Sequence, residues 1–314
     1  MDIVHLFYPV DAGMKEIPDT GQVLAIGDFD GVHLGHRSVL AEAARIAADK
    51  RLPLAVMTFN PHPREVLGME GYARYLAPIH DRMRLFEELG VDLAYVTAFD
   101  RAFARVSPEH FIDRMLVPLR IDTVVVGFDF TFGHRGSGTT DTLARLCEGR
   151  IGVSIVPPFY LDGQKVSSTL IRDALAAGEM DKVMRYLGRP YRISGWVVQG
   201  DQRGRSIGFP TANLDLTAPY VIPANGVYAV RVSVDGVRRE GVMNIGYKPT
   251  FQRESVEPTL EVHLLDFSGD LYGRTMKVDL IGYLRPERRF ASVEELTAQI
   301  RRDIDAARHL LSAV

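Results

Sequence analysis

Hydrophobic and polar positions alternate between two kinds of segment in the first 130 residues. Continuous apolar runs rich in β-branched residues predict buried strands, and they cover 23–29, 52–59, 92–99 and 122–130. Segments at 38–50 and 80–90 repeat apolar residues at helical spacing, and the second ends at Gly90, a typical C-cap. This order predicts a parallel sheet with helices on both faces.

The pattern changes after LGRPY at 187–191. Short runs of alternating residues follow, separated by Gly, Pro and Asp, and the Asp-Gly pair at 235–236 predicts a hairpin turn. These runs predict a small, closed antiparallel barrel. A terminal helix is expected from Ser292, which forms a capping-box pattern with Glu295. We therefore expect an α/β domain at 1–185 and a β domain at 186–314.

Composition narrows the class of protein. The chain has 314 residues, of which 46% are hydrophobic and 25% charged, as in globular proteins. A net charge of -3 argues against a nucleic-acid-binding protein. No apolar run reaches the ~18 residues of a membrane span, and no signal peptide is expected. The single cysteine, Cys147, excludes an internal disulfide and favours a cytoplasmic location. The sequence leaves open whether the chain forms a homo-oligomer.

The motif GDFDGVHLGH, residues 27–36, lies between a predicted strand and a predicted helix. Ligands of open α/β sheets bind at this end of the strands, and a helix N-terminus suits phosphate. The glycines permit close approach, and His33 and His36, three residues apart, can lie on one side of a helical turn and stabilise developing negative charge. Two alternatives remain open, a solvated turn and a metal site formed with Asp28 and Asp30.

Three further loops follow predicted strands or begin helices. TFNPHPREVL contains Asn60 and His62, which can reach the same crevice, or is an ordinary loop. GFDFTFGHRGSGTT contains Phe130 and Phe132, which can flank a planar ring or belong to the core. KVSSTLIRDAL places Ser167, Ser168 or Thr169 at a helix start with Arg172 in the first turn, which predicts an anion site or simple capping.

The predicted barrel carries a second candidate site. In GFPTANL, Thr211 and Asn213 are two residues apart and share one side of a strand, where their oxygens suit Mg²⁺. In EPTLEVHLLDF, Glu261 lies on the face opposite the alternating Leu260, Val262 and Leu264, which makes it a candidate general base. The alternative is that these polar residues only face water.

Together these motifs resemble bacterial bifunctional riboflavin kinase/FMN adenylyltransferases, also called FAD synthetases. In the first domain the resemblance rests on GDFDGVHLGH, TFNPHPREVL, GFDFTFG and VSSTLIR. In the second it rests on GRSIGFPTANL, GVYAV, MNIGYKPTF, LEVHLLDF and the tail from DLYGRTMKVDL onward. It covers nearly the whole chain and implies a Rossmann-like nucleotidyltransferase domain followed by a riboflavin kinase barrel.

The resemblance implies two ATP-dependent reactions, with Mg²⁺ as cofactor and ATP, riboflavin and FMN as substrates. Glu261 would act as the base of the kinase, and His33, His36 and Arg172 would act in adenylyl transfer. Implied ATP-binding residues are Gly27, Phe29, Gly31, His33, His36, Ser167, Ser168, Thr169, Arg172, Gly204, Thr211 and Asn213. Thr211 and Asn213 would also hold the metal. Asn60, Phe130, Phe132 and Asn244 are the implied flavin-binding residues.

Two positions depart from the family pattern. Leu170 stands where many relatives carry a second arginine, and HRGSGTT at 134–140 lacks an acidic residue after its first glycine. Two other functions remain open from the residues themselves. One is a metal-dependent phosphohydrolase that uses Asp28, His33, His36 and His62, and the other is a flavin-sensing protein without catalysis.

Overall fold

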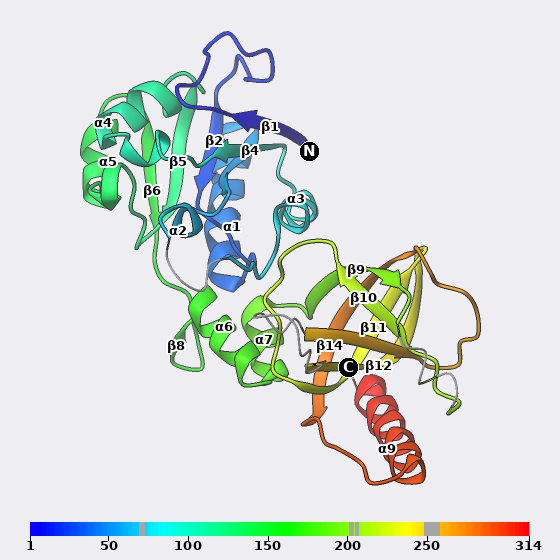
Figure 1. Ribbon diagram of the computed structural model, residues 1–314. Coiled ribbons are helices and arrows are strands. Elements are labelled where there is room, and N and C mark those ends of the chain that lie inside the picture. The colour runs from blue at the N-terminus through cyan, green and yellow to red at the C-terminus, as the bar shows by residue number, and fades with distance from the viewer. Residues whose placement is uncertain (69–72, 201–203, 205–206, 248–257, 314) are drawn as a thin grey trace. The chain divides into compact units, whose positions relative to one another are not determined.

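The computed structural model describes residues 1–68, 73–200, 204, 207–247 and 258–313. Contacts divide the chain into two compact units, Met1–Ser167 and Ser168–Val314, which are labelled by element in Figure 1. Each unit is described by itself.

The first unit is built on a six-stranded parallel sheet in the order β1-β4-β3-β2-β5-β6. Its strands are β1 (Asp2–Leu6), β2 (Gln22–Ile26), β3 (Leu54–Asn60), β4 (Leu93–Ala98), β5 (Ile121–Gly127) and β6 (Gly152–Val156). The parallel sheet confirms the sequence prediction. The two edge strands, β1 and β6, were not predicted.

Helices cover both faces of this sheet (Figure 1). They are α1 (Leu34–Lys50), α2 (Pro63–Val66), α3 (Ile79–Glu88), α4 (Pro108–Phe111) and α5 (Thr140–Cys147), with short helical turns at Phe103–Arg105, Ile112–Leu116 and His134–Gly136. Val23 and Ala25 of β2 pack in a core with α1 and α3. Leu24 and Ile26 belong to the core on the other face, with α4 and α5. A small hairpin, β7 (Tyr160–Leu161) and β8 (Gln164–Lys165), completes the unit.

Strand β2 and helix α1 differ from their predicted bounds in a way that shapes the site. The strand ends at Ile26 rather than at residue 29, and the helix begins at Leu34 rather than at residue 38. The early start follows from His33, whose side chain caps the helix. The motif at 27–36 therefore makes a short turn and the first part of a helix.

The second unit contains a closed antiparallel barrel in the order β10-β13-β12-β11-β14-β9, as predicted. Its strands are β9 (Tyr191–Val198), β10 (Ala212–Leu216), β11 (Gly226–Val234), β12 (Val237–Tyr247), β13 (Pro258–Leu264) and β14 (Thr275–Arg285). The predicted hairpin turn joins β11 and β12, with φ angles of 50° at Asp235 and 79° at Gly236. Two positive φ angles match the turn type that Asp-Gly favours.

Beside the barrel lie α6 (Ser168–Ala176), α7 (Met180–Leu187) and α9 (Val293–Ser312). Ser292 caps α9 as predicted, by accepting a hydrogen bond from Glu295 N at 3.2 Å. Helix α9 packs on β11, β12 and β14, and α7 packs on β14 and β9. Helices α6 and α7 thus belong to the compact unit of the barrel, while the boundary predicted between residues 185 and 186 stays a prediction.

Candidate active sites in the two units

The turn between β2 and α1 is conformationally unusual. Phe29 and Val32 have positive φ angles of 52° and 42°, which residues with a Cβ rarely adopt, and Gly31 has 87°. The Phe29 ring is buried beneath Gly27, where an added Cβ would lie 3.1 Å from the ring. Such a backbone persists only when its surroundings fix it, and it is often found at functional sites.

His33 and His36 lie together at the end of this turn. Their rings are stacked, with centroids 3.6 Å apart and an interplanar angle of 16°. His33 Nδ1 accepts a hydrogen bond from His36 N at 3.2 Å, so neutral His33 carries its proton on Nε2. The Phe29 ring packs edge-on against His36, with centroids 5.4 Å apart. The pair is therefore held in one orientation, with a defined donor on His33.

Gly35 brings a second motif to the same place. A Cβ at Gly35 would lie 3.1 Å from the His33 ring and 3.3 Å from the carbonyl oxygen of Val166. Val166 is the first residue of the VSSTLIR motif, so this motif begins beside the His33 ring. Ser167, half-buried, is the last residue of the first unit.

The remaining residues of VSSTLIR belong to the second unit. Helix α6 begins at Ser168, with Thr169 exposed on its first turn and Arg172 half-buried further along. The helix start is where the sequence predicts it.

A cluster of polar residues lies at the ends of β2 and β3, in which His62 and Asp30 are buried and the Asp28 side chain is partly exposed. His62 Nε2 is 3.6 Å from Asp28 Oδ2, and His62 Nδ1 accepts a hydrogen bond from Arg64 N at 3.1 Å. Burial raises the pKa of Asp28 and lowers the pKa of His62, while their mutual attraction opposes both shifts. Asp30 is buried and accepts a hydrogen bond from Ala77 N at 3.0 Å. Within the described residues, no three His, Cys, Asp or Glu side chains are arranged to hold a metal ion.

The three phenylalanines after β5 have different environments. Phe132 is 7% exposed and belongs to the core, which is the second of the two environments that the sequence left open for it. Phe130 stacks on Phe132, with centroids 5.6 Å apart and an angle of 12°. Phe128 is 40% exposed, and Lys165 Nζ lies 4.8 Å from its ring centroid. Asn60 is exposed at the end of β3.

The barrel aligns three predicted residues across neighbouring strands. Asn213 on β10 is paired with Glu261 on β13, and Glu261 is paired with Asn244 on β12. Directly opposite residues share a face of the sheet, so the three half-buried side chains form one row. Leu260, Val262 and Leu264 are buried, as the alternation predicts.

The ends of this row contact further polar groups. Asn244 Nδ2 donates to Glu287 Oε1 at 3.4 Å, a carboxylate that the sequence motifs did not single out. Thr211 immediately precedes β10, and the carbonyl of the neighbouring Pro210 lies 2.8 Å from His263 Nδ1. Gly204 O accepts a hydrogen bond from Phe209 N at 2.8 Å. Parts of two recognised motifs, at 201–203, 205–206 and 248–257, lie outside the described residues.

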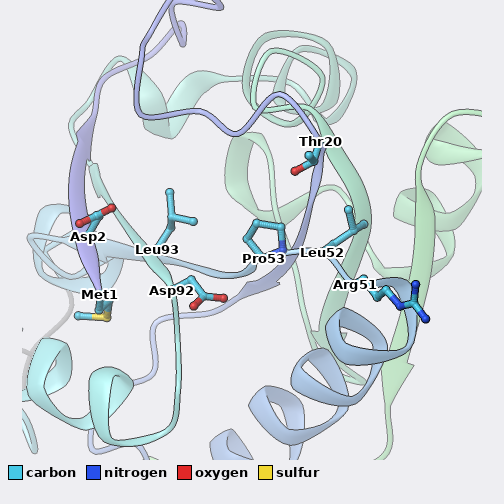
Figure 2. Close-up of a pocket in the computed structure, with 8 residues that line it drawn as sticks. All are labelled: Met1, Asp2, Thr20, Arg51, Leu52, Pro53, Asp92 and Leu93. Carbon is cyan, nitrogen blue, oxygen red and sulfur yellow. The ribbon is translucent and has the colours of Figure 1, made fainter.

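An open cavity of about 700 Å³ lies at the opposite end of the parallel sheet from the histidines. Figure 2 shows its lining, which comes from Met1, Asp2, Thr20, Arg51, Leu52, Pro53, Asp92 and Leu93. These residues precede or begin strands β1 to β4, whereas ligands of open α/β sheets bind at the carboxyl ends. The Asp92 carboxylate is also engaged, because it accepts a hydrogen bond from Leu54 N at 2.9 Å. We assign this cavity no role in the chemistry.

Two family profiles match the chain, one for each predicted activity. The FAD synthetase profile matches residues 15–170, and the riboflavin kinase profile matches residues 187–311. The fold and these profiles define a two-module transferase, with a nucleotidyltransferase module followed by a kinase barrel.

Relatives along the full length identify the family. The bifunctional riboflavin kinase/FMN adenylyltransferase of Bacillus subtilis is 43% identical over 305 residues, or 96% of each chain. The protein of the same name from Escherichia coli is 41% identical over 298 residues, or 94% of each chain. The chain belongs to the family of bifunctional riboflavin kinase/FMN adenylyltransferases.

A solved structure has the same fold along the whole chain. It is 32% identical, has a TM-score of 0.89, and covers 98% of this chain and 99% of its own. Its title describes a macrolide-efflux protein from Streptococcus pneumoniae. That title describes a different activity from the names of the curated relatives, and we do not carry it over to this chain.

In the part of the chain that the structure describes, every helix is too short or too polar to cross a membrane.

Proposed function

We propose that this chain makes FAD from riboflavin in two steps, each in its own module. The barrel transfers the γ-phosphoryl group of ATP to riboflavin, which gives FMN and ADP. The α/β module then joins AMP from a second ATP to FMN, which gives FAD and pyrophosphate. The observation that carries the proposal is the match of both family profiles, in this order, on one chain. A cytoplasmic location agrees with the single cysteine.

In the kinase step, Glu261 is the proposed base. The terminal ribityl hydroxyl attacks the γ-phosphorus, the bond to the bridging oxygen breaks, and ADP leaves. Glu261 orients the hydroxyl and accepts its proton late in the step. The pairing of Glu261 with Asn213 and Asn244 supports this role, since amide groups on both sides can hold the nucleotide and the flavin.

Mg²⁺ is the proposed cofactor of this step. Thr211 and Asn213 offer a hydroxyl and an amide oxygen, the hard ligands that Mg²⁺ accepts beside phosphate and water. The metal would neutralise charge on the phosphates. Gly204, whose carbonyl oxygen accepts a hydrogen bond from Phe209 N, is also proposed to contact the nucleotide.

In the adenylyl step, the proposed role of the α/β module is to stabilise charge. A phosphate oxygen of FMN attacks the α-phosphorus of ATP, and the bond to the β-phosphate breaks. The nucleophile is already ionised, so no base is required. His33 Nε2–H, His36, Arg172 and the hydroxyls of Ser167, Ser168 and Thr169 are proposed to donate to the phosphates.

The glycines and aromatic residues of this module have proposed supporting roles. Gly27, Phe29 and Gly31 form the turn that presents the histidines to ATP. Asn60 and Phe130 are proposed to contact the flavin, with Phe132 supporting Phe130 from the core. The stacked geometry of the two rings favours this division of roles.

Chromatography of the reaction products tests the proposal. Riboflavin with Mg²⁺ and ATP should yield FMN and then FAD, and FMN with ATP should yield FAD and pyrophosphate. If the only products are those of ATP hydrolysis, both transferase activities are excluded.

A further inference from the structure

Arg82 on helix α3 is fully buried, at 0% exposure. It lies on the inward stripe of the helix, in helical spacing with Ile79, Met83 and Phe86. That stripe ordinarily carries apolar residues, because burying a cation is costly. An arginine at this position therefore calls for a specific set of partners.

The partners of Arg82 connect two loops that follow different strands. Nη1 donates to the backbone oxygen of Asp28 at 2.7 Å and to Thr58 Oγ1 at 2.8 Å. Both Nη1 and Nη2 lie 3.4 Å from the backbone oxygen of Phe59. The Thr58 hydroxyl itself donates to Asp28 O at 2.9 Å. The guanidinium thus joins the turn after β2 to the end of β3.

The hydrogen bond from Arg82 to Asp28 O fixes the backbone directly before Phe29, where the segment with positive φ angles begins. Phe29 follows directly with its positive φ angle, and the turn then leads to His33 and His36. A backbone of this kind needs outside contacts to hold it. Arg82 supplies such a contact from beneath the turn.

Charge around Arg82 makes its burial tolerable. Asp28 and Asp30 lie near the guanidinium, and their negative charge opposes the lowering of the Arg82 pKa that burial causes. Its hydrogen bonds nevertheless go to two backbone oxygens and one hydroxyl. The arrangement resembles a brace for the backbone more than an ion pair.

We propose that Arg82 is a positioning residue for adenylyl transfer, which holds the turn that presents His33 and His36 to the triphosphate without touching it. This inference rests on the proposed function of the α/β module. Arginine suits the role because its planar fork donates in several fixed directions at once, whereas lysine has a single nitrogen.

The test uses the full-length chain with Arg82→Met, Arg82→Lys and the control Arg84→Met. Arg84 is on the same helix, but it is partly exposed and pairs with Glu88 and Asp81. Methionine retains much of the apolar stem and removes every donor. Arg82→Met should lower kcat for FAD formation by about 10²-fold, the scale of a small misplacement of reacting groups. Arg82→Lys should recover part of this loss, and Arg84→Met should match the wild type.

Two further readouts separate positioning from a general loss of structure. The KM values for ATP and FMN should change little, since the displaced groups act mainly in the transition state, and riboflavin phosphorylation should persist. Hydrogen exchange should speed up in peptides covering 28–36 in Arg82→Met and, more weakly, in Arg82→Lys, but not in Arg84→Met.

Unchanged exchange at 28–36, or kcat close to that of the wild type, would overturn the inference. An equal fall of both activities would also overturn it, because it would indicate global damage. If Arg82→Met does not fold, Arg82→Lys decides by the same readouts. A wild-type protein that makes no FAD would instead refute the proposed function, while the exchange experiment would still test the brace.

Discussion

Asn213 on β10 and Glu261 on β13 are directly opposite each other in the barrel. The two residues are far apart in the sequence, and only the antiparallel pairing of their strands makes them neighbours. A proposed metal ligand and the proposed base of the kinase step therefore lie side by side.

Replacing Glu261 with Gln should lower riboflavin phosphorylation by roughly 10²–10⁴-fold, the range for loss of a general base. Glutamine keeps the size and hydrogen-bonding capacity of the side chain but does not accept the proton. Adenylylation of FMN, supplied directly, should be unchanged. Rates of the two reactions on the same preparation provide the measurement.

Glu287 offers a matched control, because its carboxylate also lies next to Asn244. Glu287→Gln should reduce the kinase rate by less than about 10-fold, since a contact to a positioning amide is a smaller loss than a base. If Glu287→Gln is the more damaging of the two substitutions, the base has been assigned to the wrong carboxylate.

His36→Ala should lower FAD formation by about 10²–10³-fold, which is typical for the loss of one donor to a developing charge. FMN formation should persist, because the motif at 27–36 is not part of the barrel that is proposed to phosphorylate riboflavin. Arg45→Ala is a suitable control on the same helix, since Arg45 is exposed and pairs with Glu42 and Asp49. Steady-state rates of both reactions, measured on each variant, check this prediction. If both rates fall equally in His36→Ala, the two reactions share a site.

Gly35→Ala tests the close packing between the two motifs. The new Cβ would press on the His33 ring at 3.1 Å and on Val166 O at 3.3 Å, so the histidine or the start of VSSTLIR must shift. FAD formation should fall by about 10-fold or more, on the scale that misplacement costs. Because alanine is favoured over glycine in helices, the melting temperature should fall little while FAD formation falls. A variant with full FAD-forming activity would show that this spacing is not critical.

His62→Asn should make the free energy of unfolding less dependent on pH between about 5.5 and 7.5. Burial lowers the pKa of His62, so below its ordinary value of about 6.5 the unfolded chain binds a proton that the folded chain does not. Wild-type stability should therefore fall as the pH drops from about 7.5 through this window. Asparagine retains an acceptor for Arg64 N but does not titrate.

Thermal melting of the wild type and His62→Asn between pH 5.5 and 7.5 measures the difference. Asp28 acts in the opposite direction. Burial raises its pKa, so the stability that its neutral form contributes is lost as the pH rises through that raised value. Melting curves that shift in parallel across the whole range would show that His62 does not contribute to the slope.

A fragment of residues 168–314 should phosphorylate riboflavin without making FAD. Helix α7 buries Val183, Tyr186 and Leu187 and packs on β14 and β9. A shorter fragment that starts at residue 186 exposes part of this surface and should melt at a lower temperature. Equal stability of the two fragments would favour the predicted boundary at 186. A well-folded longer fragment without kinase activity would refute the two-site assignment.

The strands of both units could be predicted where their pattern is strong. Residues 23–26 are all buried, as a continuous apolar run requires when helices cover both faces of a sheet. The edge strands β1 and β6 were missed because they are partly exposed and show no such run. Burial of the alternate residues of β13 followed directly from a period of two.

The motifs of the candidate site could be predicted from the sequence, but the residues that hold those motifs in place could not. Spacing alone put His33 and His36 on one side of a helical turn, and their rings are in fact stacked. Arg82 was not singled out, because its partners are two backbone oxygens and the Thr58 hydroxyl, all from residues far away in the sequence. The signal that was available is local: a charged residue on the apolar stripe of a helix. Phe132 lies in the core, which is one of the two environments that the sequence left open for it.

His33 has a consequence for attempts to make this protein more robust. Its Nδ1 does the work that Ser, Asp or Asn normally does at a helix start. A designer who follows capping preferences would replace it with one of these residues and would see a sound or even improved melting curve. The same change would delete a proposed phosphate donor. One ring nitrogen starts the helix and thereby fixes the other as the donor, so selection for thermostability alone would pass a variant whose FAD formation is slower by about 10²–10³-fold.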